Sequence, residues 1–140
     1  VLWEEPRAAF ASSQQMPLYP GSGAPSERGA HGQIRNAALS PGDGGAAFRE
    51  AWEATLLPFL DAHRPELVIV SAGFDAHRDD PLAQLMLGED DFAWITRELC
   101  ALADRHAGGR IVSTLEGGYD LDALAASVAA HVAVLKEHAG

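Results

Sequence analysis

The stretch Leu67–Pro81, LVIVSAGFDAHRDDP, decides the fold class of this chain. It begins with a short apolar run and then breaks into loop sequence that contains glycine and acidic residues. An apolar run without alternation is typical of a strand buried on both faces of a parallel sheet. The stretch Arg110–Asp120, RIVSTLEGGYD, repeats this order of strand and loop. We therefore expect two buried parallel strands whose loops leave the same edge of one sheet.

The loops after these two strands hold the first candidates for chemistry, because sites in parallel sheets lie just past the carboxyl ends of the strands. The candidate side chains are acidic or phenolic: Asp75, Asp79, Asp80, Glu116 and Tyr119. The two adjacent aspartates also fit a simpler role as caps or solvated loop charges. A phenol at the end of a strand fits either an oxyanion donor or a core ring with a solvated hydroxyl.

Composition excludes several classes of protein. The chain has 140 residues, a formal net charge of −10 and a sequence pI of about 4.8. This balance argues against binding to nucleic acid or to an anionic membrane, although it suits a cationic substrate as well as simple solubility. The single cysteine, Cys100, excludes an internal disulfide, and no apolar run approaches the ~20 residues of a membrane span. Residues 1–10 show no signal peptide, so a cytoplasmic location is expected.

The amino-terminal third is rich in loop signals. The sequence starts at Val1 rather than Met, and we expect it to lack the amino end of a larger domain. Short strands are expected at 1–3 and near 8–10. Prolines and glycines then concentrate in residues 13–45, which predicts a long loop with one brief strand at 34–39. A loop of this length is either functional or a surface connector.

The rest of the chain predicts alternating helices and strands. A helix from 45 to 63 should be capped by Asp43 and interrupted at Pro58. A strand at 66–70, a helix that starts near 88–91, a strand at 110–115 and a helix at 121–136 follow. Asp120 is the expected cap of the last helix, whose buried face should hold Leu121, Leu124, Ala125, Val128, Val132 and Leu135.

Two further sequence patterns each fit more than one role. Asp75 and His77 lie two residues apart and would face the same side of an extended backbone, where both could reach one metal ion. Gly117 and Gly118 stand before a helix and suit either a tight turn or an anion site.

Three motifs together resemble one family. SAGFDAHRDDPLA, LEGGYD and the upstream PLYPGSG with Glu27-Arg28-Gly29 are similar to the carboxyl-terminal half of the histone deacetylase and acetylpolyamine amidohydrolase family, in its bacterial, class II-like branch. The resemblance implies an α/β fold, a three-layer open sandwich with a mostly parallel sheet, also known from arginase. Residues 1–140 would be the carboxyl-terminal portion of one domain, with 13–45 as a channel-lining loop region and 46–140 as an α-β-α-β-α part.

The resemblance also implies roles for single residues. The aspartate of the GFD motif, a zinc ligand in the family, is Asp75 here. The tyrosine of the GGY motif, which clamps the substrate carbonyl oxygen, is Tyr119. The substrate channel would be bordered by Tyr19, Leu82, Gly117 and Gly118. Ser12 matches a serine that helps to hold a structural potassium ion. His77 is frequent in this motif but is not a family ligand.

The sequence departs from the family pattern in two ways. In the family, the other two zinc ligands belong to an Asp-x-His motif and the general base and acid are tandem histidines, and both lie upstream of the part that this chain resembles. The chain has no His-His pair, and its own Asp-x-His triplets do not correspond to that upstream motif. Gln14 also replaces the usual histidine of a local Ser-x-His-Gln segment. The missing amino-terminal half of the domain would therefore be a partner of this chain and would supply most of the site.

The expected function is zinc-dependent hydrolysis of an N-acetyl amide, either acetyl-lysine or an acetylated polyamine, within a longer domain. The chain alone is expected to bind zinc weakly and to show little activity. One alternative is an inactive fragment or interaction module that keeps only the fold. Another is a metal-independent phosphate or nucleotide binder that uses Gly117 and Gly118.

Overall fold

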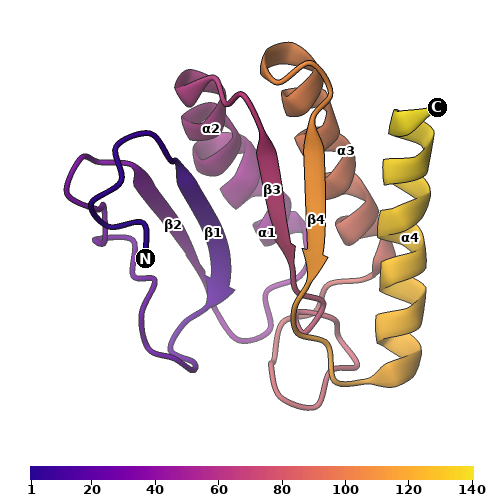
Figure 1. Cartoon of the computed structure of the whole chain (residues 1–140). Helices are drawn as coiled ribbons and strands as arrows, with labels where there is room; N and C mark the ends of the chain where they lie inside the picture. Colours follow the sequence, from indigo (N-terminus) through magenta and orange to yellow (C-terminus); the bar gives the residue numbers. More distant parts are fainter.

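The computed structural model describes residues 1–140, and its elements follow the predicted alternation of helices and strands (Figure 1). Two strands precede the first helical segment, and two more alternate with the later helices. The elements are β1 (Phe10–Gln15), β2 (Ile34–Leu39), α1 (Gly45–Ala51), the π-helical turn η1 (Trp52–Leu56), α2 (Leu57–His63), β3 (Val68–Ala72), α3 (Glu89–His106), β4 (Ile111–Leu115) and α4 (Leu121–Ala139).

The strands form two parallel pairs. β1 pairs with β2 from Phe10 opposite Ile34, and β3 pairs with β4 from Val68 opposite Ile111. Figure 1 shows the order β2, β1, β3, β4 across the molecule, with all four strands running in the same direction. No strand hydrogen bonds join β1 to β3, so the two pairs remain separate sheets. The α/β class and the parallel pairing of β3 with β4 are confirmed.

The helical segment 45–63 is continuous but changes its winding. A π-helical turn separates α1 from α2, and Pro58 lies in the first turn of α2. Proline has no N–H to donate to the preceding turn, and the π-helical turn ends directly before the turn that contains Pro58. The predicted interruption at Pro58 is confirmed. The predicted cap is wrong, because the Oδ2 atom of Asp43 accepts from the N–H of Ser40. The N-cap residue of α1 is Gly44, which has no side chain to cap the helix.

The last helix begins as predicted, and its buried face coincides with the predicted face only in part. The Oδ1 atom of Asp120 accepts from the N–H of Ala123, which confirms this cap. The buried residues of α4 are Ala123, Ser127, His131 and Val134. Leu121, Ala125 and Val132 were expected in the core and are instead exposed. The other three expected residues are partly buried and pack against core residues, as predicted: Leu124, Val128 and Leu135. Many residues of this helix are alanine, so hydrophobic spacing defines its face poorly, and polar contacts between α3, α4 and β4 determine the orientation.

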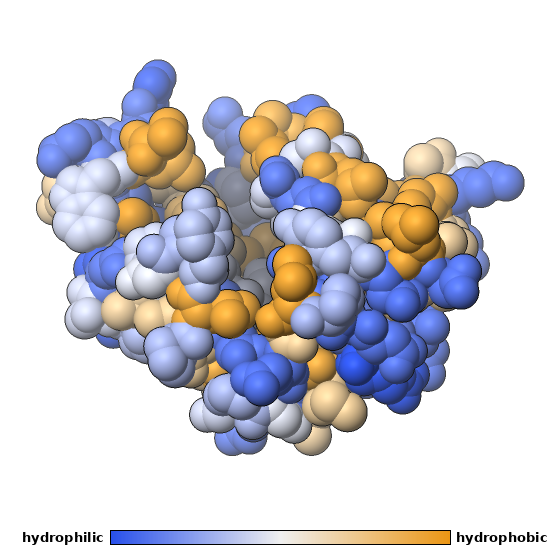
Figure 2. Space-filling view, turned by 90° about the horizontal axis from the view of Figure 1, so that it is seen from below, coloured by the Kyte–Doolittle hydropathy of each residue, from blue (hydrophilic) through white to orange (hydrophobic).

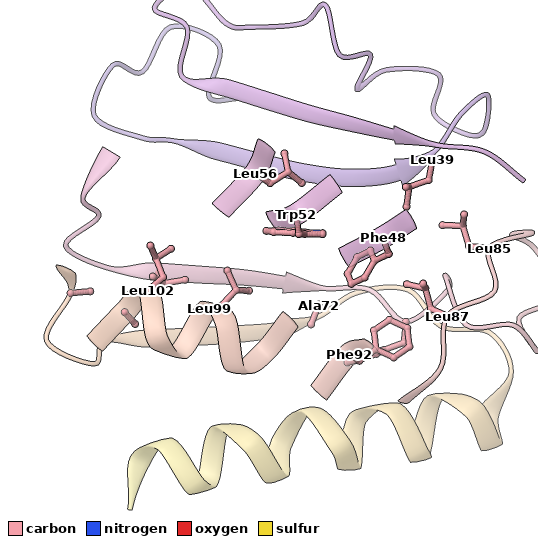
Figure 3. Packing of buried hydrophobic residues seen from close by; sticks show 14 residues of the cluster. Leu39, Phe48, Trp52, Leu56, Ala72, Leu85, Leu87, Phe92, Leu99 and Leu102 are labelled. Carbon is pink, nitrogen blue, oxygen red and sulfur yellow. The ribbon is translucent and has the colours of Figure 1, made fainter. Parts of the chain in front are cut away.

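The main core lies where α1, η1, β3 and α3 meet (Figure 3). Phe48 and Trp52 come from the first helical segment, and Phe92 and Leu99 come from α3. The ring of Phe48 packs against Trp52 with centroids 6.2 Å apart, and that of Phe92 packs on Phe74 at 5.0 Å. The predicted spacing of aromatic residues on the first helix therefore identified core positions.

One face of the β3–β4 sheet is open. Ile69 and Val112 point away from the helices and are 69% and 55% exposed. The prediction that these strands are buried on both faces is therefore wrong for this chain, because its helices cover only one side of the pair (Figure 1). A parallel sheet with an uncovered apolar face is unusual among folded domains.

The amino-terminal expectations are met only in part. No strand forms at Val1–Trp3, whereas β1 begins at Phe10 and continues into the segment that was expected to be a loop. β1 is largely polar, so the sequence pattern did not predict it as a strand. It is identified in the structure by its pairing with β2. Cys100 is a buried free thiol, and none of the helices combines the length and apolar character that a membrane crossing requires.

Candidate functional site

The loops that follow β3 and β4 meet at one edge of the sheet. Ala72 and Leu115 are paired at the ends of the two strands. Beyond them, the N–H of Phe74 donates to the carbonyl of Gly117 at 2.8 Å, and the N–H of Glu116 donates to the carbonyl of Ala72 at 2.9 Å. The loop that carries Asp75 is thus hydrogen bonded to the loop that carries Tyr119, as expected from two parallel neighbouring strands.

Asp75 is a half-buried carboxylate without a cationic partner. A Cβ atom on Gly117 would lie only 2.8 Å from its Oδ2 atom, so the two loops approach closely because position 117 is glycine. Burial raises the pKa of Asp75, and the nearby charge of Asp80 adds to this rise. A carboxylate in such a position favours a cation beside it, because its charge is otherwise uncompensated.

Tyr119 extends from the second loop and is 55% exposed. Its main-chain N–H donates to the Oδ2 atom of Asp80 at 2.9 Å. Gly118 precedes it at φ 144°, and a Cβ there would lie 2.7 Å from Leu124 Cδ1. The phenol therefore lies at the predicted edge of the sheet and is accessible to a ligand.

The other loops reach the same edge. The N–H of Gln84 donates to the Oε1 atom of Gln15 at 2.7 Å, which joins the end of β1 to the segment after Pro81. Tyr19 follows β1 and is almost fully exposed, and Leu82 is also exposed. Figure 2 views the molecule from this side and shows apolar side chains exposed among hydrophilic ones. The loops thus lie near each other, while the channel role of the two side chains stays a prediction.

His77 is packed in the protein interior. Its ring is buried and stacks beside Phe92, with centroids 6.5 Å apart. The Nδ1 atom accepts from the N–H of Asp79 at 3.1 Å, so the Nε2 atom carries the proton and points toward Glu89. Ring packing and the Nδ1 contact give the imidazole a structural role, while its buried Nε2 atom has no hydrogen-bond partner and lies 3.6 Å from the Oε1 atom of Glu89. The Asp-x-His spacing therefore has a packing explanation for the ring.

The structure also places Ser12 and the glycine pair Gly117 and Gly118. Ser12 lies in β1 opposite Asn36, and its role at a potassium ion stays a prediction. The main chain of Gly117 and Gly118 is tightly enclosed by Asp75, Phe74 and Leu124. Close packing explains both glycines, and the acidic cap at the start of α4 opposes a phosphate there. This geometry disfavours the phosphate-binding alternative.

No three histidine, cysteine, aspartate or glutamate side chains of the chain gather closely enough to hold a metal ion. Asp75 alone fits one ligand position. A surface hollow also lies elsewhere, at the opposite end of β4, where Asp104, Gly109 and His138 line it. The Nδ1 atom of His138 and the Oδ2 atom of Asp104 lie 3.6 Å apart there, but the hollow is open to solvent and holds no further titratable group, so the site is better sought at the loops.

Comparison with known proteins agrees with this arrangement. A family model described as "Histone deacetylase domain" matches residues 1–135. The chain belongs to the histone deacetylase family. This deacetylase-family chain superimposes on the crystal structure of the HDA15 HD domain with a TM-score of 0.89 and 32% identity, over 98% of this chain and 40% of that one. The expectation that the chain forms part of a deacetylase fold is confirmed.

Two curated relatives of the deacetylase-family chain are informative. The "Probable deacetylase" of Archaeoglobus fulgidus is 35% identical over 125 residues, which are 87% of this chain and 35% of the relative. The "Histone deacetylase-like amidohydrolase" of Pseudomonas aeruginosa is 42% identical over 103 residues, which are 74% of this chain and 27% of the relative. The chain therefore spans about a third of the length of these relatives.

Sequence reasoning did not separate Asp80 from its neighbour Asp79. Asp80 is 8% exposed and accepts main-chain hydrogen bonds from both loops, whereas Asp79 is exposed. The signal was an aspartate before Pro81 with free amides two and three residues later, which is typical of a local turn. The contact with Tyr119 had no local signal, because 39 residues separate the partners.

Proposed function

We propose that this chain forms part of a zinc-dependent deacetylase that hydrolyses the acetyl amide of an acetylated amine, either acetyl-lysine or an acetylated polyamine. The observation that carries the proposal is the hydrogen-bonded junction of the two loops, from Phe74 N–H to the Gly117 carbonyl. It brings a half-buried carboxylate and an exposed phenol to one edge of the sheet. Membership of the histone deacetylase family, and relatives named deacetylase and amidohydrolase, support the reaction class.

Asp75 would hold the zinc ion. Its carboxylate is half-buried, lacks a cationic partner and has a raised pKa, which makes a bound cation favourable. Zinc, when bound, polarises a carbonyl group and lowers the pKa of a coordinated water. A catalytic zinc site needs about three protein ligands, and the remaining ligands and the tandem histidines would come from the amino-terminal half of the domain.

Tyr119 would stabilise the oxyanion. Its hydroxyl is a neutral donor at the mouth of the site, and the carbonyl oxygen of an amide gains negative charge when water attacks it. A donor positioned in advance binds this charged oxygen more strongly than the neutral carbonyl, which lowers the barrier. The main chain of Tyr119 is held in place by its hydrogen bond to Asp80.

The approach for the acyl chain would be bordered by Tyr19, Leu82, Gly117 and Gly118. An aromatic ring and an apolar side chain suit the methylene chain of lysine or a polyamine, and glycines let the chain pass close to the backbone. The net charge of −10 suits a substrate with cationic groups. Ser12, which lies in β1, would contribute to a structural potassium site.

An amino-terminal half of the domain would also complete the sheet. Ile69 and Val112 leave an apolar face uncovered, and the adjacent edges of β1 and β3 have no partner (Figure 1). Covering this face would remove apolar area from water, at about 25 cal/mol per Å². The same half would then supply both packing and catalytic groups.

A second candidate function is an interaction module that keeps only the fold. It is favoured by the finding that no three potential metal-binding side chains cluster within residues 1–140. Under this alternative, joining the chain to an amino-terminal half with the Asp-x-His and His-His motifs would not produce turnover.

The test is deacetylation of an acetyl-lysine peptide and of an acetylated polyamine by the complete domain that contains this chain. Tyr119→Phe should lower kcat roughly 10²-fold, as expected for loss of one oxyanion donor. Leu121→Ala is a control at an exposed position two residues away. A Tyr119→Phe domain that turns over at the normal rate would remove the assigned role.

A further inference from the structure

Asp80 has an environment that its sequence position does not suggest. It is 8% exposed and has no ion-pair partner, yet its carboxylate accepts three main-chain hydrogen bonds. The Oδ1 atom accepts from the N–H groups of Leu82 at 2.9 Å and Ala83 at 3.4 Å. The Oδ2 atom accepts from the N–H of Tyr119 at 2.9 Å. A buried carboxylate without a cation is stable only when hydrogen bonds of this kind compensate its charge.

The two carboxylate oxygens serve different purposes. The bonds to Leu82 and Ala83 form a local turn of the kind that aspartate commonly makes. The turn requires only one oxygen. The bond from the second oxygen to Tyr119 crosses from one loop to the other, so a turn-forming role alone does not explain it.

Tyr119 has few other anchors. Its ring is exposed and its hydroxyl has no hydrogen-bond partner within the chain, so the direction of the side chain depends on the main chain. On one side, Gly118 at φ 144° allows conformations that other residues rarely adopt. On the other side, Asp120 caps α4. The Asp80 contact is therefore the one side-chain bond that holds the Tyr119 peptide.

We propose that Asp80 is a positioning residue for Tyr119, which fixes the main chain of the second loop so that the phenol points at the reacting carbonyl. The proposal rests on the function proposed above. Asp80 acts through Tyr119 and does not itself contact the substrate. It also ties Leu82 to the same carboxylate, so the channel border and the oxyanion donor share one anchor.

The first experiment measures amide hydrogen exchange by NMR in this chain. Asp80→Asn should speed exchange at the Tyr119 N–H about tenfold to hundredfold, since a bond to a charged acceptor is lost. Asp80→Ser keeps an acceptor for the Leu82 amide but is too short to reach Tyr119, and it should give the same result. Asp79→Asn removes the same charge from an exposed neighbour and should leave exchange at Tyr119 unchanged. Unchanged exchange in both Asp80 variants would overturn the contact.

The second experiment measures kcat and KM of the complete domain. Asp80→Ser should lower kcat about tenfold or more with little change in KM, and Asp79→Asn should not. In a Tyr119→Phe background, Asp80→Ser should cost almost nothing further, because the group that it positions is already gone. Equal losses in both backgrounds would overturn the positioning role. A normal rate for Tyr119→Phe would instead contradict the proposed function, and the exchange data would still decide whether Asp80 holds Tyr119.

Discussion

Replacement of His131 by alanine tests the polar junction that orients α4. The Thr96 hydroxyl donates to the Phe92 carbonyl at 2.6 Å, so its oxygen accepts from the Nδ1–H of His131 at 2.7 Å. The Nε2 atom then accepts from the Ser113 hydroxyl at 2.8 Å. One neutral imidazole thus joins α3, α4 and β4.

The magnitude follows from these contacts. His131→Ala removes two hydrogen bonds worth about 1 kcal/mol each. It also removes a ring that packs edge-on against Phe74, with centroids 5.8 Å apart, for about 1 kcal/mol more. We expect the free energy of unfolding to fall by about 3 kcal/mol in total. For a chain of this size, Tm should fall by about 10 °C.

The effect should depend on pH. Burial lowers the pKa of His131, so the unfolded chain binds a proton more readily than the folded chain does. The contribution of His131 to stability is fully present above the unfolded pKa of about 6.5 and is lost as pH falls below it. Between pH 8 and pH 5.5 this contribution should fall by at most about 1.4 kcal/mol, and in His131→Ala that part of the pH dependence should disappear.

Urea unfolding followed by circular dichroism at pH 8 and pH 5.5 measures both effects. His63→Ala is the matched control, because it removes an exposed imidazole at the end of α2 and should change stability by less than about 0.5 kcal/mol. A His131→Ala chain as stable as the wild type, or one with an unchanged dependence on pH, would refute the assigned contacts.

Three further predictions concern the site and the core. Burial raises the pKa of Asp75, so the charge of its carboxylate destabilises the folded chain above about pH 4. Asp75→Asn should therefore raise Tm at pH 7 in metal-free solution and leave Tm unchanged at pH 3. Added zinc should reduce the difference in Tm at pH 7. Leu56→Ala should cost about 3 kcal/mol in urea unfolding, because that side chain is fully buried, whereas Leu121→Ala should be nearly neutral. Gly118→Ala should destabilise the chain by more than about 1 kcal/mol in the same assay, since its Cβ would meet Leu124.

Local sequence determined the elements that depend on neighbouring residues. The GFD and GGY loops follow apolar runs, and the cap at Asp120 lies at the helix end that it defines. The strand at 34–39 was predicted at its observed bounds. These features require only short-range sterics and hydrogen bonds, which a sequence pattern encodes directly.

Only the tertiary structure decided the features that depend on distant partners. β1 is polar and forms because β2 pairs with it, and the buried face of α4 follows the contacts of His131 with two other elements. The role of Asp80 depends on an amide 39 residues away, and the open face at Ile69 depends on which helices cover the sheet. Each is set by packing between segments remote in the chain, and no local pattern of residues specifies such packing.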